Sequence, residues 1–258
     1  MSVRRGRLEG LITVPAAGWA FETNDDAGNH PCTLTSGTYY LTSFVAAFQT
    51  AINVPAGATW VVTLSAGESG TGKVTITNDD TVCEVIWDAE FFVLRDILGF
   101  SDDLENNSGA VGYTSDQQCR SLWLPDGPMV SKYGATDAGD IETDARAVES
   151  PGGDVRVIYG QQKNVNSLSW TVTAARARLS AETLDYESFQ SFWSDVILGE
   201  LEGCAPGGPI RVYWDAGVDN TYTEYAVVGD IIRKLTMDNL RPGWTGYYTV
   251  TLDRLVET

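Results

Sequence analysis

The chain has 258 residues, enough for one large domain or two ordinary ones with a sizeable core. Hydrophobic residues make up 43% and charged residues 20%, the balance of a folded globular protein rather than a disordered one. The net charge is -18, and so acidic a surface repels a phosphate backbone, which argues against sequence-specific binding of DNA or RNA.

The same composition argues against membranes, metals and cofactors. No apolar stretch approaches the roughly 20 residues that cross a bilayer. The basic start, with Arg4, Arg5 and Arg7, leads into a short apolar run that a proline ends, so we expect no signal peptide. The four cysteines form no C-x-x-C pair, and a single histidine leaves too few ligands for a Cys/His zinc site. We expect reduced, buried thiols.

Residues 1–100 predict a compact α+β unit of a helix, a three-stranded meander and a second helix. Apolar residues at helical spacing in residues 39–53 predict the first helix. Asp88 can cap the second helix, which Gly99 ends. The three predicted strands between the helices are residues 59–65, 73–77 and 82–87.

Residues 101–153 read as a loop-rich linker or insertion, because they are polar, rich in glycine and poorly periodic. The apolar run at residues 122–125 interrupts this segment and is expected to pack on one domain or on a neighbouring subunit. Four acidic residues alternate farther on but match no EF-hand, so a solvated acidic loop is expected, with a weak cation site as the alternative. These are Asp137, Asp140, Glu142 and Asp144.

Residues 154–258 predict a sandwich-like β-sheet with one packed helix. Residues 167–179 alternate as a half-buried strand does. An amphipathic helix then begins at Ser180, and its apolar stripe includes Phe192 and Val196. Strand-like runs at residues 210–214, 222–228 and 247–255 close the chain. The expected fold class of the whole chain is therefore α+β, mainly β.

The run Gly67 to Val74 nearly spells a phosphate-binding P-loop. Its last position should carry a hydroxyl that holds magnesium, but valine stands there. A P-loop must also open a helix, whereas Val74 begins a β-branched run. We therefore predict a hairpin turn here and no nucleotide site.

Nothing in the sequence assembles a catalytic constellation. His30 is the only imidazole, and its surroundings read as a loop with turn chemistry. Paired carboxylates of a glycoside hydrolase stay as a weaker alternative, since sequence spacing does not reveal their separation. Three tryptophans in turns or loops, Trp19, Trp123 and Trp244, are candidates for protein interfaces or for stacking on sugars.

Two parts of the chain resemble bacteriophage virion proteins. Residues 39–100 are similar to a helix–meander–helix pattern of phage structural proteins. Residues 170–256 resemble the tail-tube and distal-tail family in their long strand, their helix and their closing strands. The resemblance implies a sheet unit that joins its neighbours edge to edge in a ring, and it brings no catalytic residues.

We therefore expect a non-enzymatic structural component of a phage particle, tail or neck associated, that assembles into homo-oligomeric rings. Its partners would be itself and other virion proteins, and its location the virion, after assembly in the host cytoplasm. The alternative is a carbohydrate-binding module that uses loop Trp and Tyr side chains. The candidate interface residues are the basic arm, two loop tryptophans and an expected edge strand at residues 168–179: Arg4, Arg5, Arg7, Trp123, Trp244, Leu168 and Trp170.

Overall fold

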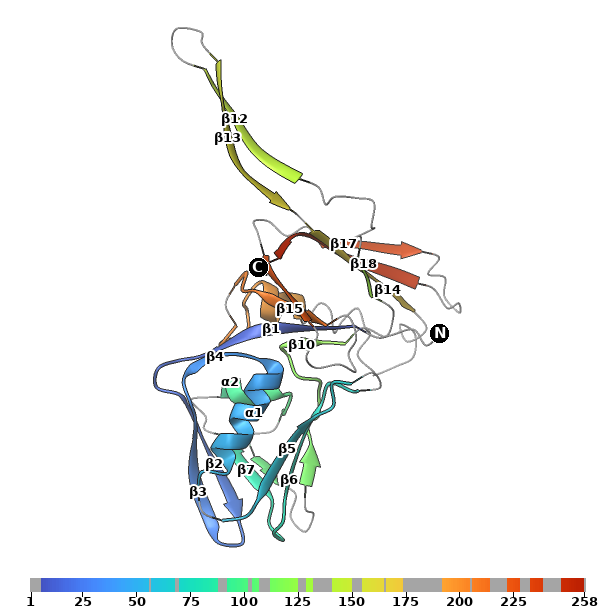
Figure 1. Cartoon of the computed structure of the whole chain (residues 1–258). Helices are drawn as coiled ribbons and strands as arrows, with labels where there is room; N and C mark the ends of the chain where they lie inside the picture. The colour runs from blue at the N-terminus through green and yellow to red at the C-terminus, as the bar shows by residue number, and fades with distance from the viewer. Residues whose placement is uncertain are drawn as a thin grey trace.

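Strands dominate the computed structural model, and every described pairing between strands is antiparallel (Figure 1). This confirms the mainly β character that the sequence predicts. The structure describes residues 6–55, 57–67, 70–87, 92–101, 104–106, 112–124, 129–131, 141–149, 155–164, 166–173, 192–204, 206–213, 222–227, 233–238 and 247–257. Among these residues, no helix is long and apolar enough to span a membrane.

The largest sheet has nine strands, and it draws on both ends of the chain. Its strands are β1 (Arg7–Val14), β4 (Gly37–Tyr40), β10 (Leu122–Trp123), β11 (Met129–Ser131), β14 (Asn166–Thr173), β15 (Ile210–Tyr213), β16 (Tyr222–Val227), β17 (Arg233–Asp238) and β18 (Tyr247–Glu257). Strand β1 pairs with β15, and also with β10 and β4. The predicted unit boundaries stay predictions, but this sheet joins residues from the first and the last predicted unit.

Apolar side chains recur at every second residue along parts of β1 and β15, and the register of the two strands places them on one face of the sheet. Leu8 and Ile12 of β1 and Val212 of β15 are all fully buried. The helix η3 (Trp193–Ile197) packs here, since a Cβ at Gly10 would overlap the Val196 side chain. Phe192, Val196 and Ile197 are buried, so the predicted apolar stripe is confirmed in its described part.

The rest of the body, apart from the nine-stranded sheet, consists of two small sheets that both contact helix α1. Its elements are β2 (Trp19–Asp25), β3 (Gly28–Leu34), α1 (Leu41–Ile52), β5 (Trp60–Leu64), β6 (Val74–Asn78), β7 (Glu84–Trp87), α2 (Phe92–Leu98), β8 (Leu104–Asn106) and β9 (Gly112–Thr114). One sheet runs β3-β2-β7-β8 and the other β5-β6-β9, with α1 in contact with both (Figure 1). Aromatic rings join the layers: the Phe48 ring lies 5.0 Å from Phe21 and 6.1 Å from Trp87.

The predicted helix at residues 39–53 and the three predicted strands are present, but the predicted meander is wrong. Strand β7 pairs with β2 and β8, not with β6, whose second neighbour is β9. The hairpin of β2 and β3 carries Asn, Asp and Pro residues, so the alternation of apolar and polar residues there is weak and predicts no strand. That hairpin supplies the edge that β7 joins.

Strands β12 (Ile141–Glu149) and β13 (Val155–Asn164) form a two-stranded ribbon that extends away from the body (Figure 1). The strands pair with each other over their whole length, with one irregularity between Thr143 and Ala145. The prediction of a loop there is wrong for this part of residues 101–153. Glu142 and Asp144 lie in β12, and Asp137 and Asp140 fall outside the described residues.

Candidate functional site

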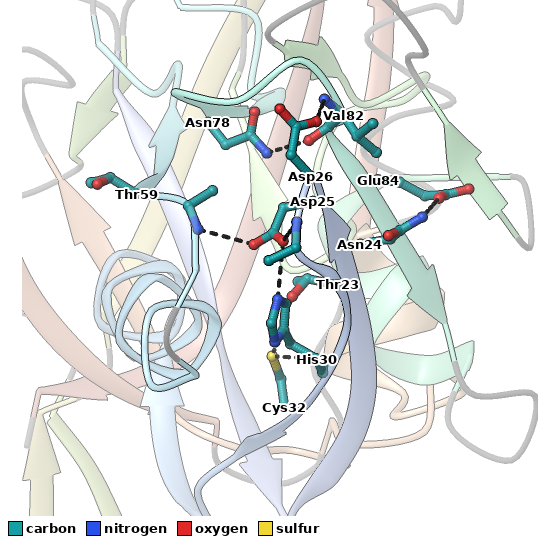
Figure 2. A network of polar contacts seen from close by, with 12 residues as sticks. Thr23, Asn24, Asp25, Asp26, His30, Cys32, Thr59, Asn78, Val82 and Glu84 are labelled. Carbon is teal, nitrogen blue, oxygen red and sulfur yellow. Dashed lines mark hydrogen bonds and ion pairs between the residues drawn. The ribbon is translucent and has the colours of Figure 1, made fainter.

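The arrangement most like an active site surrounds Asp25, at the turn between β2 and β3 (Figure 2). The His30 Nε2 atom lies 3.0 Å from Asp25 Oδ1, and Cys32 follows two residues later on the same face of β3. Only 1% of the Asp25 side chain is exposed. His30 therefore lies in a strand against a buried carboxylate, which corrects its prediction as a residue of a surface loop.

This arrangement does not make a nucleophile. The Cys32 thiol donates to the backbone carbonyl of His30 at 3.6 Å, so the imidazole ring is not its hydrogen-bond partner in this contact. Burial raises the pKa of Cys32, which keeps the thiol protonated. The Asp25 carboxylate instead accepts hydrogen bonds from the backbone N–H groups of Ala27 and Ala58, each at 2.9 Å. Burial alone would raise the pKa of Asp25, but these bonds and His30 outweigh it and hold that pKa below its ordinary value.

The neighbouring carboxylates hold the adjoining loops in the same way. Asp26 accepts the Thr81 hydroxyl at 2.7 Å and the Val82 N–H at 3.1 Å. Asp79 accepts the Thr59 N–H at 2.6 Å. The turn at Asp25 and Asp26 thus ties two loops to the β2–β3 hairpin.

A second polar network lies on the opposite face of β1 from Leu8. The Arg7 Nε atom is 3.0 Å from the Glu9 carboxylate, and both side chains are almost fully buried. Thr42 and Tyr213 donate hydroxyl hydrogen bonds to Glu9 at 3.0 and 3.3 Å. The Arg7 guanidinium lies 3.9 Å over the Tyr213 ring. Burial raises the pKa of Glu9 in spite of these partners.

On the same face, Arg211 lies beside Glu9 in the register of β15 and β1, and its guanidinium stacks on two tyrosine rings nearer the surface. The guanidinium of Arg211 lies 3.8 Å from the Tyr40 ring and 4.1 Å from the Tyr222 ring, and pairs with Glu224 at 2.7 Å. Tyr222 is 41% exposed. Arginine and tyrosine are the residues that most often dominate binding energy at protein interfaces. The alternation of Arg211 with Tyr213 in the sequence is the only signal that could have pointed to this cluster.

Several predicted interface residues lie elsewhere than the sequence indicated. Arg7 and Trp123 are fully buried within the chain, so neither is a surface group that a neighbour could reach. Leu168 and Trp170 lie in β14, which pairs with β11 at these positions and with β18, so this stretch is not a sheet edge. Trp19 is also buried, and Arg4, Arg5 and Trp244 fall outside the described residues.

In the part of the chain that the structure describes, no group of three or more His, Cys, Asp or Glu side chains is arranged to hold a metal ion. All four cysteines are free and buried, as predicted. No protein-family model matches the chain, and neither a curated protein nor a solved structure matches it either.

Proposed function

We propose that this protein is a non-enzymatic structural subunit of a bacteriophage particle, associated with the tail or neck, that assembles into homo-oligomeric rings. The tail-tube-like character of the C-terminal sheet is part of the same proposal. Its partners are further copies of the chain and other virion proteins, and its location is the virion.

The ribbon of β12 and β13 is the observation that supports assembly best. A two-stranded hairpin is marginally stable at best in water, because it has no core of its own. Within the described residues these two strands pair only with each other, and they extend away from the body (Figure 1). A neighbouring subunit supplies the surface that such a ribbon lacks.

The buried polar groups fit a scaffold better than an enzyme. The Asp25 and Glu9 carboxylates accept hydrogen bonds from groups within the body, where they fix loops and strands. The Cys32 thiol lies in an environment that favours its protonated form. The carbohydrate-binding alternative loses two of its three tryptophans, because Trp19 and Trp123 are buried.

Deleting the ribbon tests the proposal. The intact protein should form rings in negative-stain images and a mass of many subunits by light scattering. A variant in which a short Gly-Ser linker replaces residues 141–164 should stay folded but lose the rings. Circular dichroism and cooperative melting of the variant are the folding control. An intact protein that stays monomeric at every concentration overturns the proposed function.

A further inference from the structure

The outward face of the β5–β6–β9 sheet carries no charge across two rows of paired residues. In each row one residue comes from each strand, and β-branched side chains occupy five of the six positions. The six residues, named here the threonine face, are Val61, Thr77 and Gly112 in one row, and Thr63, Thr75 and Thr114 in the other. Val61 is 46% exposed, although it is a large hydrophobic residue.

The hydroxyl groups of this face are largely satisfied within it. Thr75 and Thr114 share a hydrogen bond of 2.8 Å between their hydroxyl oxygens. The Thr77 hydroxyl donates to the Val61 carbonyl at 3.5 Å. Covering a polar group is costly when its hydrogen bond is lost, but these bonds survive contact with another surface. The face therefore offers methyl groups and Val61 for packing.

Opposite charges mark the two ends of the same face. Alternation along β6 puts Lys73, just before the strand, and Asp79, just after it, on the side of Thr75 and Thr77. Lys73 forms no ion pair within the described residues, and Asp79 is exposed, with its Oδ1 atom accepting the Thr59 N–H at 2.6 Å. Asp116 adjoins the Lys73 end as a second charged group, and the Ser101 N–H and hydroxyl donate to its Oδ2 atom at 3.2 and 2.7 Å.

We propose that the threonine face packs against the threonine face of a second copy of this chain, with the two β6 strands antiparallel. A two-fold axis then brings Lys73 of each copy to Asp79 of the other, because the two residues lie about 20 Å apart at opposite ends of the face. The chain carries a net charge of -18, so copies repel one another over most of their surface. An uncharged face with complementary ends avoids that repulsion.

This inference deepens the proposed function, since it rests on self-association and names one surface that carries it. The contact is two-fold, and it joins subunits in pairs in addition to any contact around a ring. In Figure 1, β5 and β6 lie far from the ribbon of β12 and β13, so the two surfaces can be tested separately.

Charge reversal tests the pairing. Lys73→Glu should weaken self-association of the chain about tenfold or more, because two attractive contacts become two repulsive ones. The double variant K73E/D79K should regain most of it, since the two charges are exchanged. Analytical ultracentrifugation measures the dissociation constants, and melting curves confirm that each variant is folded. A folded double variant that stays as weak as Lys73→Glu would overturn the antiparallel pairing.

A matched pair of threonines tests the face itself. Thr63→Glu puts a carboxylate on the threonine face, and Thr33→Glu puts one on an exposed position of β3 in the other sheet. Only Thr63→Glu should weaken association. If the intact protein assembles and both variants assemble equally well, the inference fails and the proposed function stands. If the intact protein never associates, both fail.

Discussion

Asp25→Asn removes one negative charge from the turn that fastens the β2–β3 hairpin, and it leaves the shape of the side chain almost unchanged. In the native protein Asp25 Oδ1 accepts from Ala27 N–H and lies 3.0 Å from His30 Nε2, while Oδ2 accepts from Ala58 N–H. An asparagine has one acceptor oxygen. Whichever way its amide is turned, an NH₂ group faces a backbone N–H.

The cost follows from the lost bond. A hydrogen bond to a charged acceptor contributes about 1.5–3 kcal/mol, and a buried donor left without an acceptor costs about 1–3 kcal/mol. Because the Asp25 side chain is only 1% exposed, water does not replace the missing oxygen. We therefore expect Asp25→Asn to lower the free energy of unfolding by about 2–3 kcal/mol at neutral pH.

The effect depends on pH in a defined direction. The folded state lowers the pKa of Asp25 below its ordinary value of 3.8. The carboxylate therefore stabilises the fold fully above the ordinary value, and this stabilisation disappears as the pH falls through the lowered value. The unfolding curves of the native protein and the variant should converge in acid.

Urea denaturation followed by tryptophan fluorescence measures both effects. Asp80→Asn is the matched control, because it removes the same charge from the loop after β6 and no hydrogen bond of the Asp80 carboxylate is described. The control should change stability by less than about 0.5 kcal/mol. Equal stability of the two variants at neutral pH, or a difference that persists unchanged into acid, would refute the reasoning.

Three further predictions concern the other buried groups. Arg7→Met should lower the free energy of unfolding by about 3–5 kcal/mol because it leaves the Glu9 carboxyl group buried without its cation, whereas R7M/E9M should lower it less; additive losses would contradict this. Arg211→Ala should lower the free energy of unfolding by about 1–2 kcal/mol, because the guanidinium no longer stacks on two tyrosine rings, and Arg211→Lys should restore only part of that stability. Chemical denaturation measures both, and full recovery by lysine would argue against stacking. Burial raises the pKa of Cys83 to about 11 and of Cys204 to about 12, so native thiols should resist a disulfide reagent until denaturant is added. Rapid labelling of the folded protein would disprove their burial.

Elements with strong local patterns were predictable. The stripe of residues 39–53 gives α1, in which Phe44, Phe48 and Ile52 are buried. Gly99 ends α2 with a φ of 85°, the left-handed conformation that glycine adopts at low cost. The glycines before β6 form a turn and not a P-loop, with the Gly72 N–H bonded to the Ser65 carbonyl.

The candidate surfaces were less predictable, because a pattern along the chain does not state which distant strand lies beside it. Arg7 was predicted to be part of a basic arm at an interface, yet it lies in β1, which pairs with β15, and its side chain is fully buried. Trp123 looked like a loop aromatic, yet the pairing of β10 with β1 buries it.

The sequence by itself determined the elements whose local pattern is strong, such as α1, β5 and β6, because those choices depend on residues a few positions apart. Only the tertiary structure decided which strands pair, and with that which side chains are buried and which faces stay open. Pairings such as β1 with β15 join residues about two hundred positions apart, and any alternating strand offers the same backbone groups to such a partner.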